Sequence, residues 1–151
     1  MLHKTNKSII RFNLFRSLTP LEAGIIERSV YKRRFKAGER IVQEGDAAVG
    51  IYLINTGEVK IYKSIKNRQI EIAVLTAGSF FGELTLLRES PRTATVTAAE
   101  PTELLCLFRP EFLEILHHYP TICAKFLPNF SQVIIERINN MHAELQKLRP
   151  S

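Results

Sequence analysis

Between Tyr31 and Arg109, apolar and polar residues alternate in short runs, which is the period of two that β-strands follow. Turn signals separate these runs, for example at residues 37–39, 45–46 and 56–57, and each of these contains a glycine. Many short strands at this spacing favour a sandwich, a jelly roll or a barrel. The expected strands are Tyr31–Phe35, Arg40–Gln43, Gly50–Asn55, Glu58–Lys63, Ile70–Leu75, Thr93–Ala99 and Glu103–Arg109.

A helical pattern precedes this β region. Thr19 can cap a helix that has Pro20 in its first position, and Glu22 stands where it completes a capping box. The helix should run to about Ser29. The residues expected on its buried side are Leu21, Ile25 and Ile26.

Two more helices are expected after the β region. Pro110 begins one that ends near His118, and Pro120 begins a longer one that reaches about Leu148. Pro128 lies inside the longer helix and should kink or break it, because proline removes a helical hydrogen bond. The chain therefore combines a central β region with helices at both ends.

One loop interrupts the β region, at Phe81–Val96 (FGELTLLRESPRTATV). Gly82 suits a positive φ or a close approach to a ligand, and a short helix over Glu83–Leu87 would present free N–H groups to an anion. Arg92 follows on the same loop, and its planar guanidinium can bind a phosphate through two parallel hydrogen bonds. A sugar with a free hydroxyl and a bridging phosphate would use both Glu83 and Arg92.

A second interpretation of this loop is a surface turn without a ligand. In that case Glu83 and Arg92 form an ion pair with each other, worth about 0–1 kcal/mol. The spacing of the residues alone favours this second interpretation.

The loop resembles the phosphate-binding cassette of cyclic nucleotide-binding domains, whose pattern is F-G-E-L-x-L, four variable residues, and then P-R-x-A-x-V. This family occurs in bacterial transcription activators, in regulatory subunits of kinases and in ion channels. The similarity extends from about Phe15 to Leu148, because the glycines of the turns also follow the family's order. It implies an α+β fold: an antiparallel, jelly-roll-like β-roll with an N-terminal helix and C-terminal helices.

The resemblance also implies roles for individual residues. Glu83 would accept the ribose 2′-hydroxyl and Arg92 would bind the cyclic phosphate, with no metal and no cofactor besides this ligand. Thr85 replaces the Ala or Gly usual in the family, so its hydroxyl would bond either the ligand or the short helix. Thr93 permits cyclic GMP without selecting it. The implied ligand-binding residues are Gly82, Glu83, Leu84, Thr85, Arg92, Thr93 and Ala94.

In this family the base lies against an apolar wall and is covered by the C-terminal helix. The period of two predicts Ile61, Ile72 and Leu75 as wall residues. On the C-terminal helix, the residues placed to cover the base are Asn139, Met141 and His142. Each is equally explained as an ordinary helix residue. Ligand binding would then shift the helices at 110–148 over the base, since only the closed state gains those contacts.

The long helix has a heptad-like apolar stripe of about two repeats, which is short of the three or four that define a coiled coil. Two interpretations stay open: the stripe packs on the chain's own β-roll, or it forms a homodimer seam as in bacterial catabolite activators. The stripe consists of Ile134, Ile138, Met141, Leu145 and Leu148.

Length and composition fit one globular domain. With 151 residues, 45% apolar and 24% charged, the chain can form a core and is not of the disordered type. We expect a flexible basic N-terminus at 1–14 and a single cyclic nucleotide-binding domain at 15–151, with the β-roll at about 31–109 and the C-terminal helices at about 110–148. No apolar run of about 18 residues and no signal peptide is found, so a cytoplasmic protein without a membrane segment is expected.

The cysteines and the charge are less specific. Cys106 and Cys123 are interpreted as two buried thiols of a reducing compartment, and no metal-ligand spacing exists. The net charge is +6, with a cluster at Lys32–Lys36. Such a balance suits an anionic ligand or nucleic acid, but it is also common on plain solvated faces, and we favour that explanation.

Three functions follow from these patterns. The first is a non-enzymatic allosteric sensor for cyclic AMP, with cyclic GMP as the second choice, that acts on an unknown downstream protein. The second is the sensor half of a transcription regulator, although a chain that ends at Ser151 has no room for a helix-turn-helix, so nucleic acid is not expected as its partner. The third is a protein-interaction scaffold. An enzyme is not expected, because no nucleophile–base pair and no Walker-type loop is found.

Overall fold

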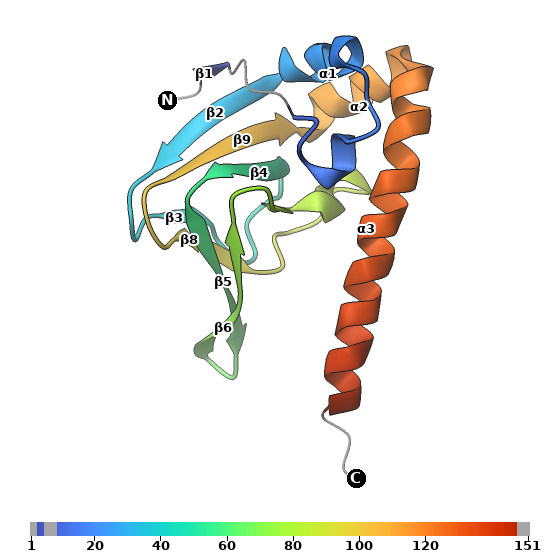
Figure 1. Cartoon of the computed structure of the whole chain (residues 1–151). Coiled ribbons are helices and arrows are strands. Elements are labelled where there is room, and N and C mark those ends of the chain that lie inside the picture. The colour runs from blue at the N-terminus through green and yellow to red at the C-terminus, as the bar shows by residue number, and fades with distance from the viewer. Residues whose placement is uncertain (1–2, 5–8, 148–151) are drawn as a thin grey trace.

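The structure is a computed structural model that describes residues 3–4 and 9–147. A β-roll lies beside α1 (Pro20–Glu27) and α2 (Arg109–His118), and the long α3 (Pro120–Lys147) runs along one side of it (Figure 1). Every strand pair in the described residues is antiparallel. The expected α+β architecture, an antiparallel β-roll with helices at both ends, is confirmed.

The strands of the described residues form two sheets. Sheet A has the order β1-β2-β9-β4-β7 and sheet B the order β3-β8-β5-β6. Sheet A consists of β1 (His3–Lys4), β2 (Val30–Phe35), β4 (Gly50–Thr56), β7 (Phe80–Phe81) and β9 (Thr102–Phe108). Sheet B consists of β3 (Arg40–Val42), β5 (Glu58–Ile65), β6 (Arg68–Thr76) and β8 (Thr95–Ala98).

All seven expected strands are present, with small shifts at their ends. Strand β8 begins two residues later than expected, at Thr95, so Thr93 and Ala94 belong to the loop before it. Two strands of two residues each, β1 and β7, were not expected, since two residues are too few to show a period. The loop at 81–96 thus leaves sheet A at β7 and enters sheet B at β8.

Helix α1 begins with the expected capping box. The Thr19 hydroxyl accepts a hydrogen bond from the Glu22 N–H (3.2 Å), and the Glu22 carboxylate accepts one from the Thr19 N–H (2.9 Å). The expected burial was wrong for Leu21, which is 77% exposed. Ala23 and Ile26, three residues apart, face the core instead, and Ile25 is only partly buried.

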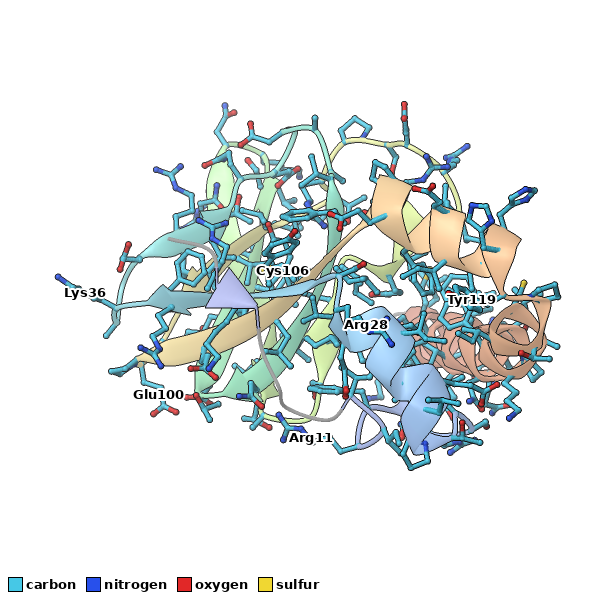
Figure 2. The ribbon with its side chains drawn as sticks, turned by 90° about the horizontal axis from the view of Figure 1, so that it is seen from above. Arg11, Arg28, Lys36, Glu100, Cys106 and Tyr119 are labelled. Atoms are coloured by element: carbon cyan, nitrogen blue, oxygen red, sulfur yellow. The ribbon has the colours of Figure 1, made fainter. Side chains whose placement is uncertain are left out.

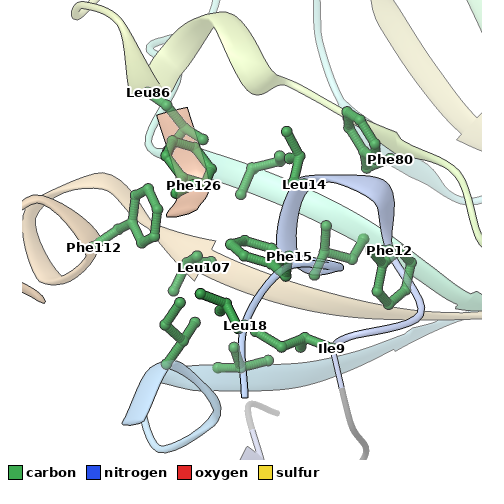
Figure 3. Close-up of a cluster of buried hydrophobic side chains, with 14 of the residues drawn as sticks. Ile9, Phe12, Leu14, Phe15, Leu18, Phe80, Leu86, Leu107, Phe112 and Phe126 are labelled. Atoms are coloured by element: carbon green, nitrogen blue, oxygen red, sulfur yellow. The ribbon is translucent and has the colours of Figure 1, made fainter. Parts of the chain in front are cut away.

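The expectation of a flexible N-terminus was wrong for residues 9–14. Ile9, Phe12 and Leu14 have no exposed surface and pack in the core cluster of Figure 3. Arg11 points the other way and donates a hydrogen bond to the carbonyl oxygen of Asn55 (3.0 Å). Burial of three large apolar side chains supplies the free energy that orders this segment. Residues 1–2 and 5–8 lie outside the described residues.

Pro128 was expected to kink or break α3, and it does not break it, because the helix is continuous from Pro120 to Lys147. Phe126 and Phe130 flank this proline, are 2% and 5% exposed, and stack with ring centroids 5.3 Å apart. A proline inside a helix costs about 3 kcal/mol, and burial of two phenylalanines offsets a cost of that size.

The core has two parts that meet at the start of the loop. One cluster packs sheet A against the helices, and the other lies inside the roll, where Cys106 is found among the strands (Figure 2). Phe80 belongs to the first cluster and Phe81 to the second, because successive side chains of a strand point to opposite faces. Leu86 also belongs to the first cluster, so the loop is fixed at both ends of its first turn.

Candidate ligand-binding site

The loop begins with a backbone turn that only glycine makes at low cost. Gly82 has φ +84°, in the left-handed region, and a Cβ at this position would overlap the guanidinium of Arg92. A single 3₁₀ turn follows at Glu83–Leu86, one residue shorter than the helix expected there. Its backbone bonds run from Thr85 N–H to the Gly82 carbonyl (3.1 Å) and from Leu87 N–H to the Leu84 carbonyl (3.0 Å).

Arg92 is fixed at its backbone and at one side of its guanidinium. Its N–H donates to the Asp46 carbonyl (2.7 Å), its own carbonyl accepts from Gly45 N–H (2.8 Å), and its Nη2 donates to the Gly50 carbonyl (2.8 Å). The residue is only 7% exposed, and burial lowers the pKa of its guanidinium. Arg92 is thus a buried cation in a fixed position.

The second terminal nitrogen of Arg92, Nη1, is buried and has no hydrogen-bond partner among the described residues. An unpaired buried donor on a charged group is costly, and such groups are normally paired with an anion or a carbonyl. Nη1 lies against Gly82, where the missing side chain leaves room. This arrangement suits an anion that approaches over Gly82.

Glu83 does not pair with Arg92. Its buried carboxylate, 5% exposed at the side chain, is 2.9 Å from Nε of Arg137 on α3, and no ion pair within residues 9–147 joins it to Arg92. The guanidinium of Arg137 also lies 5.6 Å from the ring centroid of Phe80. The interpretation of the loop as a turn closed by a Glu83–Arg92 ion pair is therefore wrong.

Sequence reasoning missed Arg137. The ion pair joins residues 54 positions apart (137 − 83), and nothing in the local helix pattern marks an arginine as a pocket residue. The available signal was spacing: Arg137 falls three residues after Ile134 and four before Met141, on the same helix face.

A cavity of about 410 Å³ brings these groups together. This volume falls within the range of small-molecule sites, which is roughly 300–1,000 Å³. Its polar lining includes Glu83, Thr85, Arg92 and Arg137. Its apolar lining comes mainly from sheet B and α3. The expected site residues that line the cavity are Gly82, Glu83, Leu84, Thr85, Arg92, Thr93, Ala94, Ile61, Ile72 and Met141.

Leu75, an expected wall residue, does not line the cavity and packs inside the roll. The register of β5 and β6 explains this result. Ile61 pairs with Ala73 and Tyr62 with Glu71, so Ile72 is an extra residue in a β-bulge. The bulge lets both Ile72 and Ala73 line the cavity. Leu75 pairs with Val59, two residues along from the Ile61–Ala73 pair on the same face, so it lies further along the strand, beyond the cavity lining.

Of the three expected cover residues, only Met141 lines the cavity. Asn139 and His142 lie elsewhere on α3, and the His142 ring is 3.1 Å from the Gln146 side chain on the exposed surface. The face that covers the cavity consists of Ile134, Arg137, Ile138 and Met141, which follow the helical spacing of three and four.

The apolar stripe of α3 is only partly packed on the chain's own β-roll. Ile134 contacts the core, whereas Ile138, Met141 and Leu145 are 56%, 61% and 58% exposed. Leu148, the last residue of the stripe, lies outside the described residues. Three of the four described stripe residues are thus available for contacts that the single chain does not supply.

In the part of the chain that the structure describes, no three His, Cys, Asp or Glu side chains are placed to hold a metal ion, and no helix is long and apolar enough to cross a membrane. Cys106 and Cys123 are free thiols, and burial raises the pKa of Cys106 to about 12. A hollow of about 450 Å³ on the outer side of sheet B contains Arg40 and Tyr62 but no carboxylate.

Residues 32–119 match the family model of the cyclic nucleotide-binding domain. The chain belongs to this family. The matched range contains the whole loop at 81–96, with Glu83 and Arg92, but ends before α3. The expected resemblance is confirmed.

Individual relatives agree with this assignment. The Cyclic AMP receptor protein of Thermus thermophilus is 30% identical over 136 residues, which cover 89% of this chain and 61% of the receptor. The crystal structure of the catabolite activator protein of the same organism has a TM-score of 0.79 at 30% identity, covering 90% of this chain and 62% of that one. The chain therefore spans less than two thirds of these relatives.

A structure with a bound ligand is also similar. The regulatory domain of Toxoplasma gondii PKA, co-crystallised with cAMP, has a TM-score of 0.66 at 30% identity, over 71% of this chain and 41% of that one. This similarity includes a eukaryotic regulatory domain as well as a bacterial receptor, so the fold is shared by proteins with different outputs.

Proposed function

We propose that this chain binds a cyclic nucleotide, cyclic AMP in the first place, and acts as a non-enzymatic regulatory sensor. The observation that carries the proposal is the buried, unpartnered Nη1 of Arg92 in a cavity that also contains the carboxylate of Glu83. An anionic phosphate satisfies the first group and a sugar hydroxyl satisfies the second. A cyclic nucleotide has both within one small molecule.

The residues of the cavity then have separate roles. Arg92 donates to the cyclic phosphate through Nη1, and Gly82 leaves room for the phosphate to approach. Glu83 accepts a hydrogen bond from the ribose 2′-hydroxyl. Ile61, Ile72 and Met141, which line the apolar end, contact the base.

Arg137 links the site to helix α3. The Nε of Arg137 contacts the Glu83 carboxylate at 2.9 Å. A sugar hydroxyl that binds Glu83 therefore changes the ion pair that Arg137 makes from α3. The ligand also adds apolar contacts to Ile138 and Met141, which are more than half exposed. Both effects favour a closed state, in which α3 covers the base, over an open state. The ligand shifts the equilibrium between them to the extent that it binds the closed state more tightly.

The choice of cyclic AMP over cyclic GMP draws on two relatives: one is named a cyclic AMP receptor and the other was crystallised with cAMP. Cyclic GMP stays the second candidate because Thr93, at the rim of the cavity, offers a hydroxyl to a purine. Calorimetric titration of the purified chain with cyclic AMP, cyclic GMP and a cyclic dinucleotide tests the proposal. We expect saturable one-site binding of cyclic AMP. No heat and no thermal shift with any of the three would favour a protein-interaction scaffold instead.

The exposed part of the α3 stripe favours a homodimer. Ile138, Met141 and Leu145 lie on one helix face at a spacing of three and four, which is the pattern of a helix–helix seam. Light scattering after size exclusion tests this point, with a dimer expected for the wild type. The variant Leu145→Glu should be a monomer. A wild type that is monomeric at every concentration overturns the seam.

The downstream output belongs to a protein or domain still to be identified. Since the chain spans 61% of the Thermus thermophilus receptor, the sensor half of a longer transcription regulator is the second candidate function. The mass of the endogenous protein separates the two candidates. A mass equal to that of this chain favours a sensor that acts on a separate protein.

A further inference from the structure

The guanidinium of Arg92 has no carboxylate partner among residues 9–147 and lies instead over an aromatic ring. Its Cζ is 5.2 Å from the ring centroid of Tyr52, a residue of β4 that is 5% exposed. A cation over the face of an aromatic ring is attracted by the negative charge of that face, and the attraction is strongest where water is excluded.

Tyr52 itself is fixed by the strand that leads into the loop. In the β4–β7 pair it stands opposite Phe81, and the two rings stack with centroids 5.2 Å apart and an interplanar angle of 22°. On the other side of β4 it pairs with Cys106 of β9. The ring therefore has little freedom to turn. Gly82 directly follows Phe81, the strand partner of Tyr52.

A ring under Arg92 has a different consequence from a carboxylate. A carboxylate would neutralise the guanidinium and would compete with an incoming anion for its N–H groups. A neutral ring contacts only the face of the guanidinium plane and leaves its edge available. One edge nitrogen, Nη2, donates to the Gly50 carbonyl at 2.8 Å, and the other, Nη1, stays unpaired beside Gly82.

The hydroxyl of Tyr52 is a separate influence on Arg92. Burial lowers the pKa of the guanidinium, and Tyr52 acts in the opposite direction through its phenolic oxygen. The ring and the hydroxyl of Tyr52 therefore have to be tested apart.

We infer that Tyr52 is a positioning residue for the anion site: its ring holds the Arg92 guanidinium in the orientation that presents Nη1 to a bound phosphate. The inference rests on the proposed function, because the phosphate is that of the cyclic nucleotide. Tyr52 does not line the cavity, so it acts through Arg92 and not by contact with the ligand.

The test compares Tyr52→Leu with Tyr52→Phe, which keeps the ring and loses only the hydroxyl. Ile54→Val, two residues along the same strand and in the same core cluster, controls for a general loosening of β4. Affinity is measured by calorimetry with cyclic AMP and by competition with adenosine, which lacks the phosphate. Thermal unfolding shows that each variant is folded.

Tyr52→Leu should bind cyclic AMP about tenfold more weakly than the wild type, a change that corresponds to loss of a desolvated cation–π contact. Tyr52→Phe and Ile54→Val should bind as the wild type does, and the affinity for adenosine should be equal in all four proteins. Equal weakening for cyclic AMP and adenosine would mean a merely structural role and would overturn the inference. So would a Tyr52→Phe variant as weak as Tyr52→Leu.

Two failures are distinguishable. A wild type that binds cyclic AMP, with a folded Tyr52→Leu variant that binds equally well, overturns the role of Tyr52 alone. A wild type that binds no cyclic nucleotide overturns the proposed function, and the inference with it.

Discussion

The floor and the cover of the cavity are built in opposite ways. The floor consists of Arg92 and the strand β4 beneath it, and Arg92 is 7% exposed with backbone and side-chain bonds to three other residues. The cover is the second half of α3, where Ile138 and Met141 are more than half exposed. Regions with many buried contacts open rarely, whereas regions with few open at low cost in free energy.

This difference suits the two tasks of the proposed sensor, ligand binding and response. A preorganised floor gives affinity, because little entropy is lost when the ligand binds. A weakly packed cover gives the response, because small ligand contacts change its population. The first half of α3 belongs with the floor, since Phe126 and Phe130 are buried in the core.

The largest effect is expected at the floor, from Arg92→Leu. Loss of a charge-assisted contact with the phosphate should weaken cyclic AMP binding by about 2–5 kcal/mol. The melting temperature should stay unchanged or rise, because the variant removes a buried cation with an unpaired donor. Calorimetry and thermal unfolding measure the two quantities. The control is Arg88→Leu, an exposed arginine of the same loop, which should bind normally.

The second effect concerns the backbone of the floor. Gly82→Ala should lower the free energy of unfolding by about 1–2 kcal/mol, because alanine is strained at positive φ. It should also weaken cyclic AMP binding, since the new Cβ displaces the Arg92 guanidinium. Gly24→Ala in α1 is the matched control: space around Gly24 is open, and alanine there should stabilise the helix. A Gly82→Ala chain with wild-type affinity would contradict the proposed approach over Gly82.

The third effect is at the cover, from Arg137→Leu. A half-exposed ion pair is worth about 0–1 kcal/mol, so affinity for cyclic AMP should change less than tenfold. The response should change more: ligand should no longer protect the second half of α3 from hydrogen exchange. Asn139→Leu, on the same helix but outside the cavity, should keep that protection. Loss of protection in both variants would show that Arg137 has no specific part in the coupling.

The smallest effect lies outside both regions, at the ion pair between Glu22 of α1 and Lys125 of α3, 2.7 Å apart. The hydrogen bond from Lys125, followed by that from the Thr19 N–H, lowers the pKa of Glu22 from 4.5 to about 2. A carboxylate whose pKa is lower in the folded state stabilises the protein above its unfolded pKa and loses this contribution as the pH falls. The difference in melting temperature between wild type and Glu22→Gln should therefore be full at neutral pH and shrink between pH 4.5 and about 2. A difference that is constant over this range would contradict the assignment.

The parts of the fold that sequence predicted are those with a local cause. Strands such as β2 follow from a period of two, the turn at Gly82 from the need for a positive φ, and the start of α1 from a capping box. The site was predicted because Glu83 and Arg92 stand in one short motif. Their burial in one cavity follows from that motif and the strands around it.

The parts that sequence did not predict have causes far away in the chain. Arg137 reaches Glu83 only because α3 packs beside the roll, and Ile72 lines the cavity next to Ala73 because of a bulge beside Tyr62. Continuity through Pro128 depends on the burial of its neighbours, and the order of residues 9–14 depends on a core formed by other elements. Tertiary packing decided each of these cases against the local preference.

The most direct test of the account is a crystal structure of the chain grown with cyclic AMP. We expect the ligand in the cavity between sheet B and α3, with its phosphate within hydrogen-bond distance of Arg92 Nη1 and its 2′-hydroxyl donating to the Glu83 carboxylate. A cavity without ligand under saturating cyclic AMP, or a ligand whose phosphate lies away from Arg92, would contradict it.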